Sequence, residues 1–134
     1  IRGIVLAAGL GRRMGAPKAL LTLDGRTFLQ RAVDALRSAG LEVIAVVNPP
    51  VDAATPAEGF GAGRVVNLDP DGANGMFGSV RLGVLEALRL GDRGALLLPV
   101  DLPLVTTADV EAVRIRLRAG AEVWYRRMEG GGAI

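Results

Sequence analysis

Short apolar runs alternate along the chain with segments in which apolar residues recur at helical spacing. Three of the runs are apolar almost throughout and end at turn residues, a pattern that predicts strands buried on both faces. Two shorter segments have the same character. The predicted strands are Arg2 to Ala8, Glu42 to Asn48, Arg64 to Asn67, Ala95 to Val100 and Glu122 to Arg127.

Three further segments have the signals of helices, and they extend from Thr27 to Ala39, from about Ser79 to Leu90, and from Thr106 or Thr107 to about Arg118. In the first of them, Thr27 and Gln30 have capping-box spacing and Gly40 marks the end. In the second, helical spacing predicts one apolar face made of Val80, Val84, Leu85 and Leu88.

Two segments without this periodicity are predicted to be loops. Pro49 to Gly63 is rich in proline, alanine and glycine, which favours a mobile surface loop. Asp69 to Gly78 is a second turn-rich loop, directly before the helix expected near Ser79.

The order of these elements predicts the fold class. Apolar strands that alternate with helices are typical of a mostly parallel sheet covered on both faces, which is a three-layer αβα domain. Residues 1–134 are expected to form one such domain. Because the chain starts without methionine and stops at GGGAI shortly after the last predicted strand, we expect its C-terminus to be truncated.

The composition excludes several kinds of chemistry. Cysteine and histidine are both absent, so disulfides, thiolate nucleophiles, the usual zinc sites and a Ser-His-Asp triad are excluded. The formal net charge is only +2, and the sequence has no concentrated basic stripe. We therefore expect no nucleic-acid partner. No apolar run approaches the roughly 18 residues of a membrane span. We therefore expect a cytoplasmic protein with no membrane partner.

The stretch LAAGLGRRMGAPKALL, Leu6 to Leu21, follows the first predicted strand and includes Lys18, the only lysine in the chain. Glycines allow backbone N–H groups to point into one anion-binding concavity, while arginine and lysine add positive charge. The pattern favours a polyphosphate site. It matches neither the G-x-G-x-x-G fingerprint nor the Gly-Lys-Ser/Thr ending of a P-loop. A plain glycine-rich turn with solvated arginines is the alternative.

This stretch resembles the signature loop of the MobA-like nucleotidyltransferases, written roughly L-A-[AG]-G-x-[SG]-x-R-M-G-x-x-K-x-L. The resemblance covers nearly the whole chain and implies the Rossmann-like fold of the nucleotide-diphospho-sugar transferase type, with residues 1–134 as a single nucleotidyltransferase domain. The loop residues would wrap a nucleoside triphosphate. The resemblance implies that the base is bordered by Leu6, Ala7, Ala8 and Gly9, and that phosphates are bound by Gly11, Arg12, Arg13 and Lys18.

Two later segments agree with the resemblance. PVDLPLV, from Pro99, is similar to the family's strand-end aspartate followed by x-Pro-Leu, and Asp101 would hold Mg²⁺ there. NGMFGSV, from Asn74, is similar to a G-M-x-x-S segment in which Gly75 and Ser79 would lie near the base and the acceptor. Taken alone, Asp101 could be a turn residue and Ser79 a simple helix cap.

The implied activity is that of a magnesium-dependent nucleotidyltransferase, in which Lys18, Asp101 and Arg13 would be the catalytic residues. The L-A-A-G start is most similar to that of the molybdenum cofactor cytidylyltransferases, which use CTP. A separate physical argument agrees, because the Ala8 methyl group would narrow the base pocket. CTP is therefore the expected nucleotide and molybdopterin the expected acceptor. A GTP-using guanylyltransferase, a sugar- or alditol-phosphate nucleotidyltransferase and a non-catalytic nucleotide-binding module are the alternatives.

Further expectations concern the partners and the acceptor site. A molybdoenzyme or its chaperone is the expected protein partner, and a monomer or weak dimer is the expected oligomeric state. The family's Gly-His-Pro-like turn would fall near MEGGGAI, but the chain has no histidine. The sequence departs from the family pattern at this turn, so the resemblance does not extend to acceptor binding there.

Overall fold

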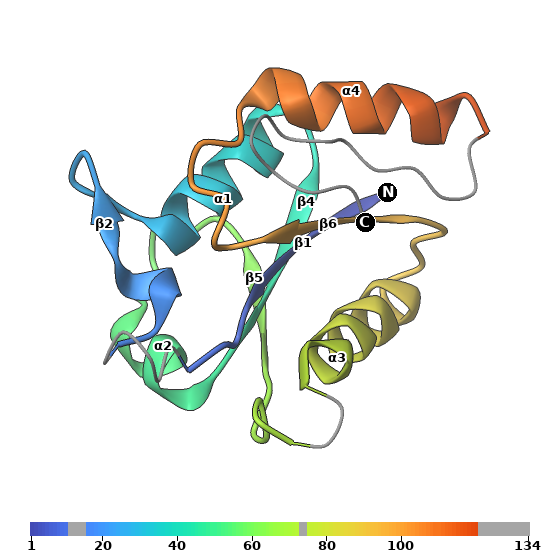
Figure 1. Cartoon of the computed structure of the whole chain (residues 1–134). Coiled ribbons are helices and arrows are strands. Elements are labelled where there is room, and N and C mark those ends of the chain that lie inside the picture. The colour runs from blue at the N-terminus through green and yellow to red at the C-terminus, as the bar shows by residue number, and fades with distance from the viewer. Residues whose placement is uncertain (11–15, 73–74, 121–134) are drawn as a thin grey trace.

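The computed structural model describes residues 1–10, 16–72 and 75–120 of the chain. In this part of the chain the main sheet has four strands in the order β5-β4-β1-β6, and every neighbouring pair is parallel (Figure 1). The strands are β1 (Arg2–Ala7), β4 (Glu42–Val47), β5 (Gly63–Val66) and β6 (Ala95–Pro99). They agree with four of the five predicted strands to within a residue at each end.

Helices cover both faces of this sheet, which confirms the three-layer αβα prediction. On one face, Val5 and Ala7 of β1 pack in a core cluster with α1 (Phe28–Ser38) and Val110 of α4 (Thr107–Arg118). On the other face, Ile4 and Leu6 pack against α3 (Gly75–Arg89). Figure 1 shows α1 and α4 on one side of the sheet and α3 on the other.

Two helices begin as the sequence predicts. Thr27 caps α1 by accepting a hydrogen bond from the Gln30 N–H at 3.1 Å. The Gln30 side chain does not complete a capping box, because its amide donates to Asp34 and to the Phe60 carbonyl instead. Thr106 caps α4 in a complete capping box with Asp109.

The prediction for the second helix is wrong at its start and for two of the four residues of its apolar face. α3 begins at Gly75, so Ser79 lies inside the helix. Val80 and Val84 pack against the core cluster as predicted. The buried residues of the helix are small, namely Ser79, Gly83 and Ala87, whereas Leu85 and Leu88 are 50% and 59% exposed. Small residues allow the helix axis to approach the sheet, and the leucines are left on its outer side.

The close approach of α3 depends on Gly83. A Cβ atom built there would lie 2.7 Å from Cγ2 of Ile4 and 3.1 Å from Cγ2 of Val46. Both distances are below ordinary van der Waals contact, so a larger residue would force the helix away from the sheet.

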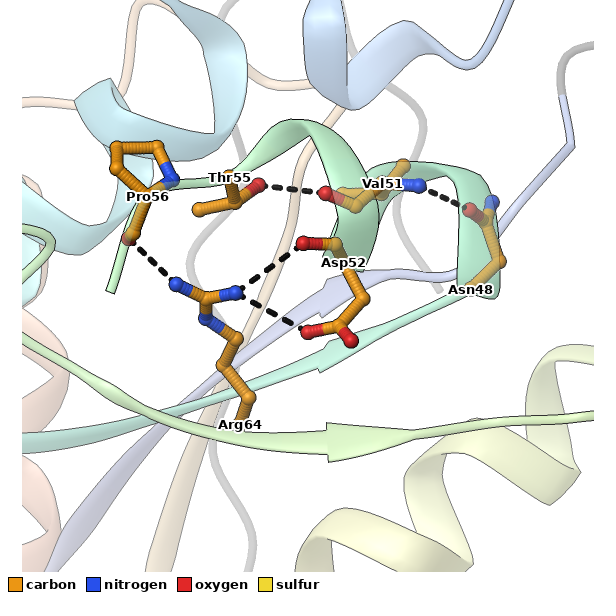
Figure 2. Close-up of polar contacts among 6 residues, drawn as sticks. All are labelled: Asn48, Val51, Asp52, Thr55, Pro56 and Arg64. Carbon is orange, nitrogen blue, oxygen red and sulfur yellow. Dashed lines mark hydrogen bonds and ion pairs between the residues drawn. The ribbon is translucent and has the colours of Figure 1, made fainter.

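The loop predicted over Pro49 to Gly63 is also wrong in part. It contains the short helix α2 (Pro49–Ala54), and the side chains of Val51 and Phe60 are 0% and 2% exposed. Figure 2 shows what ties this segment to the sheet: the Arg64 guanidinium donates to the Asp52 carbonyl and carboxylate and to the Pro56 carbonyl. Arg64 also lies 5.0 Å from the centroid of the Phe60 ring.

A small hairpin was not predicted. The short 3-10 helix η2 (Lys18–Leu20) leads into the antiparallel pair β2 (Thr22–Leu23) and β3 (Arg26–Thr27). Asp24 and Gly25 form its turn with φ angles of 53° and 83°, which favour aspartate and glycine. The strand predicted at Glu122 to Arg127 lies outside the described residues. None of the helices in the described ranges is long and apolar enough to cross a membrane.

Candidate functional site

The strand order reverses at β1, and this creates the candidate site. The chain passes from β1 to β4 and β5 on one side, and β6 returns to the other side of β1. The segments that follow β1 and β6 therefore diverge at the carboxyl edge of the sheet, which is where ligands bind in open α/β sheets. The glycine-rich stretch follows β1, and Asp101 follows β6.

Lys18 and Asp101 meet at this edge. Nζ of Lys18 lies 4.0 Å from Oδ2 of Asp101, and the two side chains are 47% and 51% exposed. An ion pair this exposed contributes only about 0–1 kcal/mol to stability. The pair matters because of where it lies: it brings together the cation and the carboxylate that the family resemblance assigns to the same ligand.

The local chain explains the position of Lys18. The Leu20 and Leu21 N–H groups donate to the Pro17 and Lys18 carbonyls, which closes the short 3-10 turn. Ala19 is 1% exposed and anchors that turn in the core, while its neighbour Lys18 is exposed. The ammonium group is thus presented to solvent by a fixed backbone.

Asn48 joins β4 to the beginning of the glycine-rich stretch. It is 0% exposed, and its Nδ2 donates to the carbonyls of Ala8 at 3.1 Å and Gly9 at 3.2 Å. Its Oδ1 accepts from the Val51 N–H at 2.8 Å and caps α2 (Figure 2). One side chain therefore fixes both the first helix turn after β4 and the first loop residues after β1.

A second buried amide joins β5 to α3. Nδ2 of Asn67 donates to the Ser79 hydroxyl at 2.9 Å, and its Oδ1 accepts from the Asp69 N–H at 3.0 Å. Both side chains are buried, at 6% and 5% exposure. Ser79 is therefore an internal hydrogen-bond partner of α3 and not its N-cap.

A pocket of about 320 Å³ opens beside this pair, at the start of α3. Its lining is glycine-rich and polar around a few leucines: Asn67, Asp69, Gly72, Gly75, Gly78, Arg81, Leu82 and Leu85. A hollow of about 380 Å³ lies among Arg2, Glu42 and Glu86. We do not assign that hollow to the site, because Arg2 and Glu42 begin their strands and lie at the opposite edge of the sheet.

The predicted site residues divide into three groups. Lys18 and Asp101 lie together, and Gly75 lines the pocket beside Ser79. Gly9 is exposed, whereas the side chains of the preceding residues are buried at 6%, 1% and 4% exposure: Leu6, Ala7 and Ala8. Gly11, Arg12 and Arg13 lie outside the described residues.

The position of Ala8 corrects one argument from the sequence. Its side chain belongs to the apolar cluster with Ile4, Leu6 and Ala87 beneath α3. The methyl group therefore packs in the core and does not line the open edge of the sheet, so it is no longer a reason to expect a narrow base pocket.

Two residues of the site were missed by reasoning from the sequence. Asn48 and Asn67 are buried amides that directly follow β4 and β5. The signal that could have found them is their position: a polar residue at the carboxyl end of a buried parallel strand lies at the ligand edge of the sheet.

The residues at this edge fit a Mg²⁺ ion held by one carboxylate. No group of three or more His, Cys, Asp or Glu side chains that could hold a metal occurs in residues 1–10, 16–72 and 75–120. Mg²⁺ commonly needs only one or two carboxylates, together with waters and substrate phosphates. The half-exposed Asp101 carboxylate meets that requirement, with Lys18 as a neighbouring anion-binding group.

The chain is an α/β domain with a parallel sheet whose strand order reverses at β1, and such switch points are where open α/β sheets bind ligands. Residues 3–133 match the model of the MobA-like NTP transferase domain, and the chain belongs to this family.

Curated relatives support the same assignment. The chain is 32% identical over 126 residues to a molybdenum cofactor guanylyltransferase of Rhizobium meliloti (strain 1021), covering 90% of this chain and 54% of the relative. It is 33% identical over 132 residues to a probable molybdenum cofactor guanylyltransferase of Opitutus terrae, covering 97% of this chain and 62% of the relative. The chain thus spans a little over half the length of these relatives.

A solved structure has the same fold. Rv0371c of Mycobacterium tuberculosis H37Rv matches with a TM-score of 0.69 and 28% identity, over 88% of this chain and 60% of that one. A second structure of that protein is a complex with manganese.

Proposed function

We propose that this chain is the nucleotide-binding part of a nucleotidyltransferase that transfers NMP from a nucleoside triphosphate to a phosphate-bearing acceptor. The observation that supports it best is the meeting of Lys18 and Asp101 at 4.0 Å, beyond the carboxyl ends of β1 and β6. A lysine is suited to triphosphate oxygens, and a carboxylate beside it is suited to the cation that accompanies them.

The proposed reaction needs no covalent protein intermediate. An oxygen of the acceptor phosphate forms a bond to the α-phosphorus of the triphosphate, and the bond from that phosphorus to the bridging oxygen breaks. The electron pair leaves with pyrophosphate. Catalysis then consists of positioning and charge neutralisation, as in phosphoryl transfer generally.

Each residue has a proposed role in that step. Lys18, through its ammonium group, would bind the phosphate oxygens on which negative charge accumulates as pyrophosphate leaves. Arg13 and Arg12, with Gly11, would bind the triphosphate from the same stretch. Asp101 would hold a Mg²⁺ ion, and this ion would supply neutralisation of the triphosphate charge. The manganese complex of Rv0371c supports testing a divalent cation.

The remaining predicted residues would contact the nucleotide in a different way. Because the Leu6, Ala7 and Ala8 side chains are buried, we propose that these residues meet the base through backbone atoms, together with Gly9. Gly75 would border the same ligand from the start of α3, where it lines the pocket beside Asn67. Ser79 would act indirectly, since its hydroxyl accepts from Asn67.

We propose GTP as the first nucleotide to test and CTP as the second. The names of the two curated relatives favour GTP, and they favour molybdopterin or the molybdenum cofactor as acceptor. The expectation of CTP came from the L-A-A-G start, whose physical argument is weakened by the burial of Ala8. A molybdoenzyme or its chaperone as partner, a monomeric or weakly dimeric state and a cytoplasmic location stay predictions.

Calorimetric titration tests the proposal directly. The protein is titrated with GTP, CTP, UTP and ATP, each with Mg²⁺ and again with EDTA. We expect saturable binding of GTP or CTP that weakens when the metal is removed. Preference for UTP or ATP would keep nucleotide binding but favour a sugar- or alditol-phosphate acceptor. Absence of binding to all four nucleotides would contradict the proposal.

A further inference from the structure

The Asn48 side chain forms three hydrogen bonds in the core that the proposed reaction does not use. Its carboxamide is 0% exposed, and all three bonds go to backbone atoms. Val51 N–H can only donate, and the carbonyls of Ala8 and Gly9 can only accept, so the orientation of the amide is determined by its partners. Figure 2 shows the Oδ1 side of this arrangement.

The two carbonyl bonds control the direction of the loop backbone. In a trans peptide the C=O and the following N–H point in opposite directions. Because the carbonyls of Ala8 and Gly9 point to Asn48, the N–H groups of Gly9 and Leu10 point away from it. Successive N–H groups held in this way are the donors from which anion-binding loops are built.

We propose that Asn48 is a positioning residue for the beginning of the proposed nucleotide-binding loop, at Ala8 to Leu10. It holds the Ala8 and Gly9 carbonyls toward the core, so that the loop amides are oriented for a ligand before the ligand arrives. The proposal rests on the proposed function for the identity of that ligand, a nucleoside triphosphate. Its structural part, that Asn48 holds the loop backbone, applies to the protein without any ligand.

The same side chain also caps α2, and a test must separate the two roles. Asn48→Asp keeps an oxygen for the Val51 N–H but places the second oxygen against two carbonyl oxygens, which removes both loop bonds. Asn48→Ser keeps a helix-capping hydroxyl that is too short to reach the loop as well. Both variants therefore preserve the cap and remove the loop contacts, and serine does so without introducing a buried charge.

A matched control weakens α2 without touching the loop. The Thr55 hydroxyl donates to the Val51 carbonyl at 2.6 Å, within α2 and its C-cap (Figure 2). Thr55→Val removes this bond and keeps the side-chain shape. If Asn48 only stabilised α2, its variants and Thr55→Val would change hydrogen exchange and nucleotide affinity equally when they lower the free energy of unfolding equally.

The first readout is hydrogen exchange of the unliganded protein, followed in peptides that cover Leu6 to Leu10. We expect exchange in both Asn48 variants to be about tenfold faster than in the wild type, the factor that one lost hydrogen bond of ordinary strength produces. In Thr55→Val we expect unchanged exchange in these peptides. Equal exchange in the Asn48 variants and the wild type would overturn the proposal.

The second readout is the dissociation constant of a non-hydrolysable GTP or CTP analogue with Mg²⁺. We expect it to rise about tenfold in the Asn48 variants and to stay within twofold in Thr55→Val. If the dissociation constant rose equally in all three variants, Asn48 would only stabilise α2, and the proposal would be overturned. If the wild type bound no triphosphate, the proposed function would fail, and the exchange experiment would still decide whether Asn48 holds the loop.

Discussion

Single residues at the carboxyl edge of the sheet are responsible for the chemistry that we propose. Lys18 begins a 3-10 turn that the buried side chain of Ala19 anchors in the core, and Asp101 follows strand β6. Both side chains are about half exposed, so neither contributes appreciably to the core. Substitutions at these two positions should therefore affect ligand binding without affecting folding.

Lys18→Ala should weaken triphosphate binding by roughly ten- to a hundredfold, because a hydrogen bond to a charged group contributes about 1.5–3 kcal/mol. Calorimetric titration and denaturant unfolding, run side by side, measure this. Arg89→Ala is the control, since it removes a 68% exposed cation that pairs with Glu86 on α3. Equal affinity of Lys18→Ala and wild type would remove this lysine from the site.

Asp101→Asn should abolish magnesium-dependent turnover and leave the free energy of unfolding within about 0.5 kcal/mol of wild type, as is usual for exposed substitutions. A pyrophosphate-release assay at several Mg²⁺ concentrations measures turnover. Asp34→Asn is the comparison, because Asp34 is likewise partly exposed and paired, at 2.6 Å from Arg26. Retained activity in Asp101→Asn would show that the metal ligand lies elsewhere.

At the scale of elements, the sequence predicted where strands and helices occur better than how they pack. The strands were found because parallel strands covered on both faces are apolar throughout, and α4 because its capping box is local. For α3, periodicity found Val80 and Val84 but not the buried small residues Ser79, Gly83 and Ala87, because small residues add little to a hydrophobic pattern. α2 was missed although Asn48 and Pro49 are local start signals, because the helix has only six residues and lies in a segment rich in proline, alanine and glycine.

Gly83→Ala tests the packing of α3. Alanine favours a helix over glycine by about 1 kcal/mol, but its Cβ would lie 2.7 Å from Cγ2 of Ile4. Overpacking of this kind costs about 1–3 kcal/mol, so we expect net destabilisation in urea unfolding. The matched experiment is a double-mutant cycle with Ile4→Ala, in whose background the added methyl should cost less. A rise in the midpoint for Gly83→Ala alone would contradict the packing argument.

At the scale of the whole molecule, the sequence alone predicted the fold class and assigned Lys18 and Asp101 to one site, and the structure brings the two side chains to 4.0 Å. The network behind this site was not predictable in the same way. Asn48 and Asn67 act through contacts with Ala8, Gly9 and Ser79 that join different strands and helices, and no local pattern records such contacts. The packing of the Ala8 methyl beneath α3 was likewise not predictable from a local pattern, and the argument for a narrow base pocket failed for that reason.

Ligand binding should be visible in the stability of the whole domain. A triphosphate that binds only the folded state stabilises it by about 2.7 kcal/mol at a hundredfold excess over its Kd, which corresponds to roughly 10 °C in Tm for a domain of this size. Differential scanning fluorimetry with GTP or CTP and Mg²⁺ measures the shift. The Lys18→Ala protein should show a smaller shift at the same concentrations, and an equal shift would contradict the role of Lys18.

The central position of β1 also has a consequence for synthesis of the chain. Arg2 in this strand lies opposite Glu42 on one side and Ala95 on the other. Of the four strands of this sheet, β1 is therefore the first to be synthesised, and it needs partners from two later parts of the chain. Contacts so distant along the chain form slowly, and a nascent strand that waits for them is open to wrong pairing. During translation, β1 depends on its neighbour β4 alone until β6 has emerged.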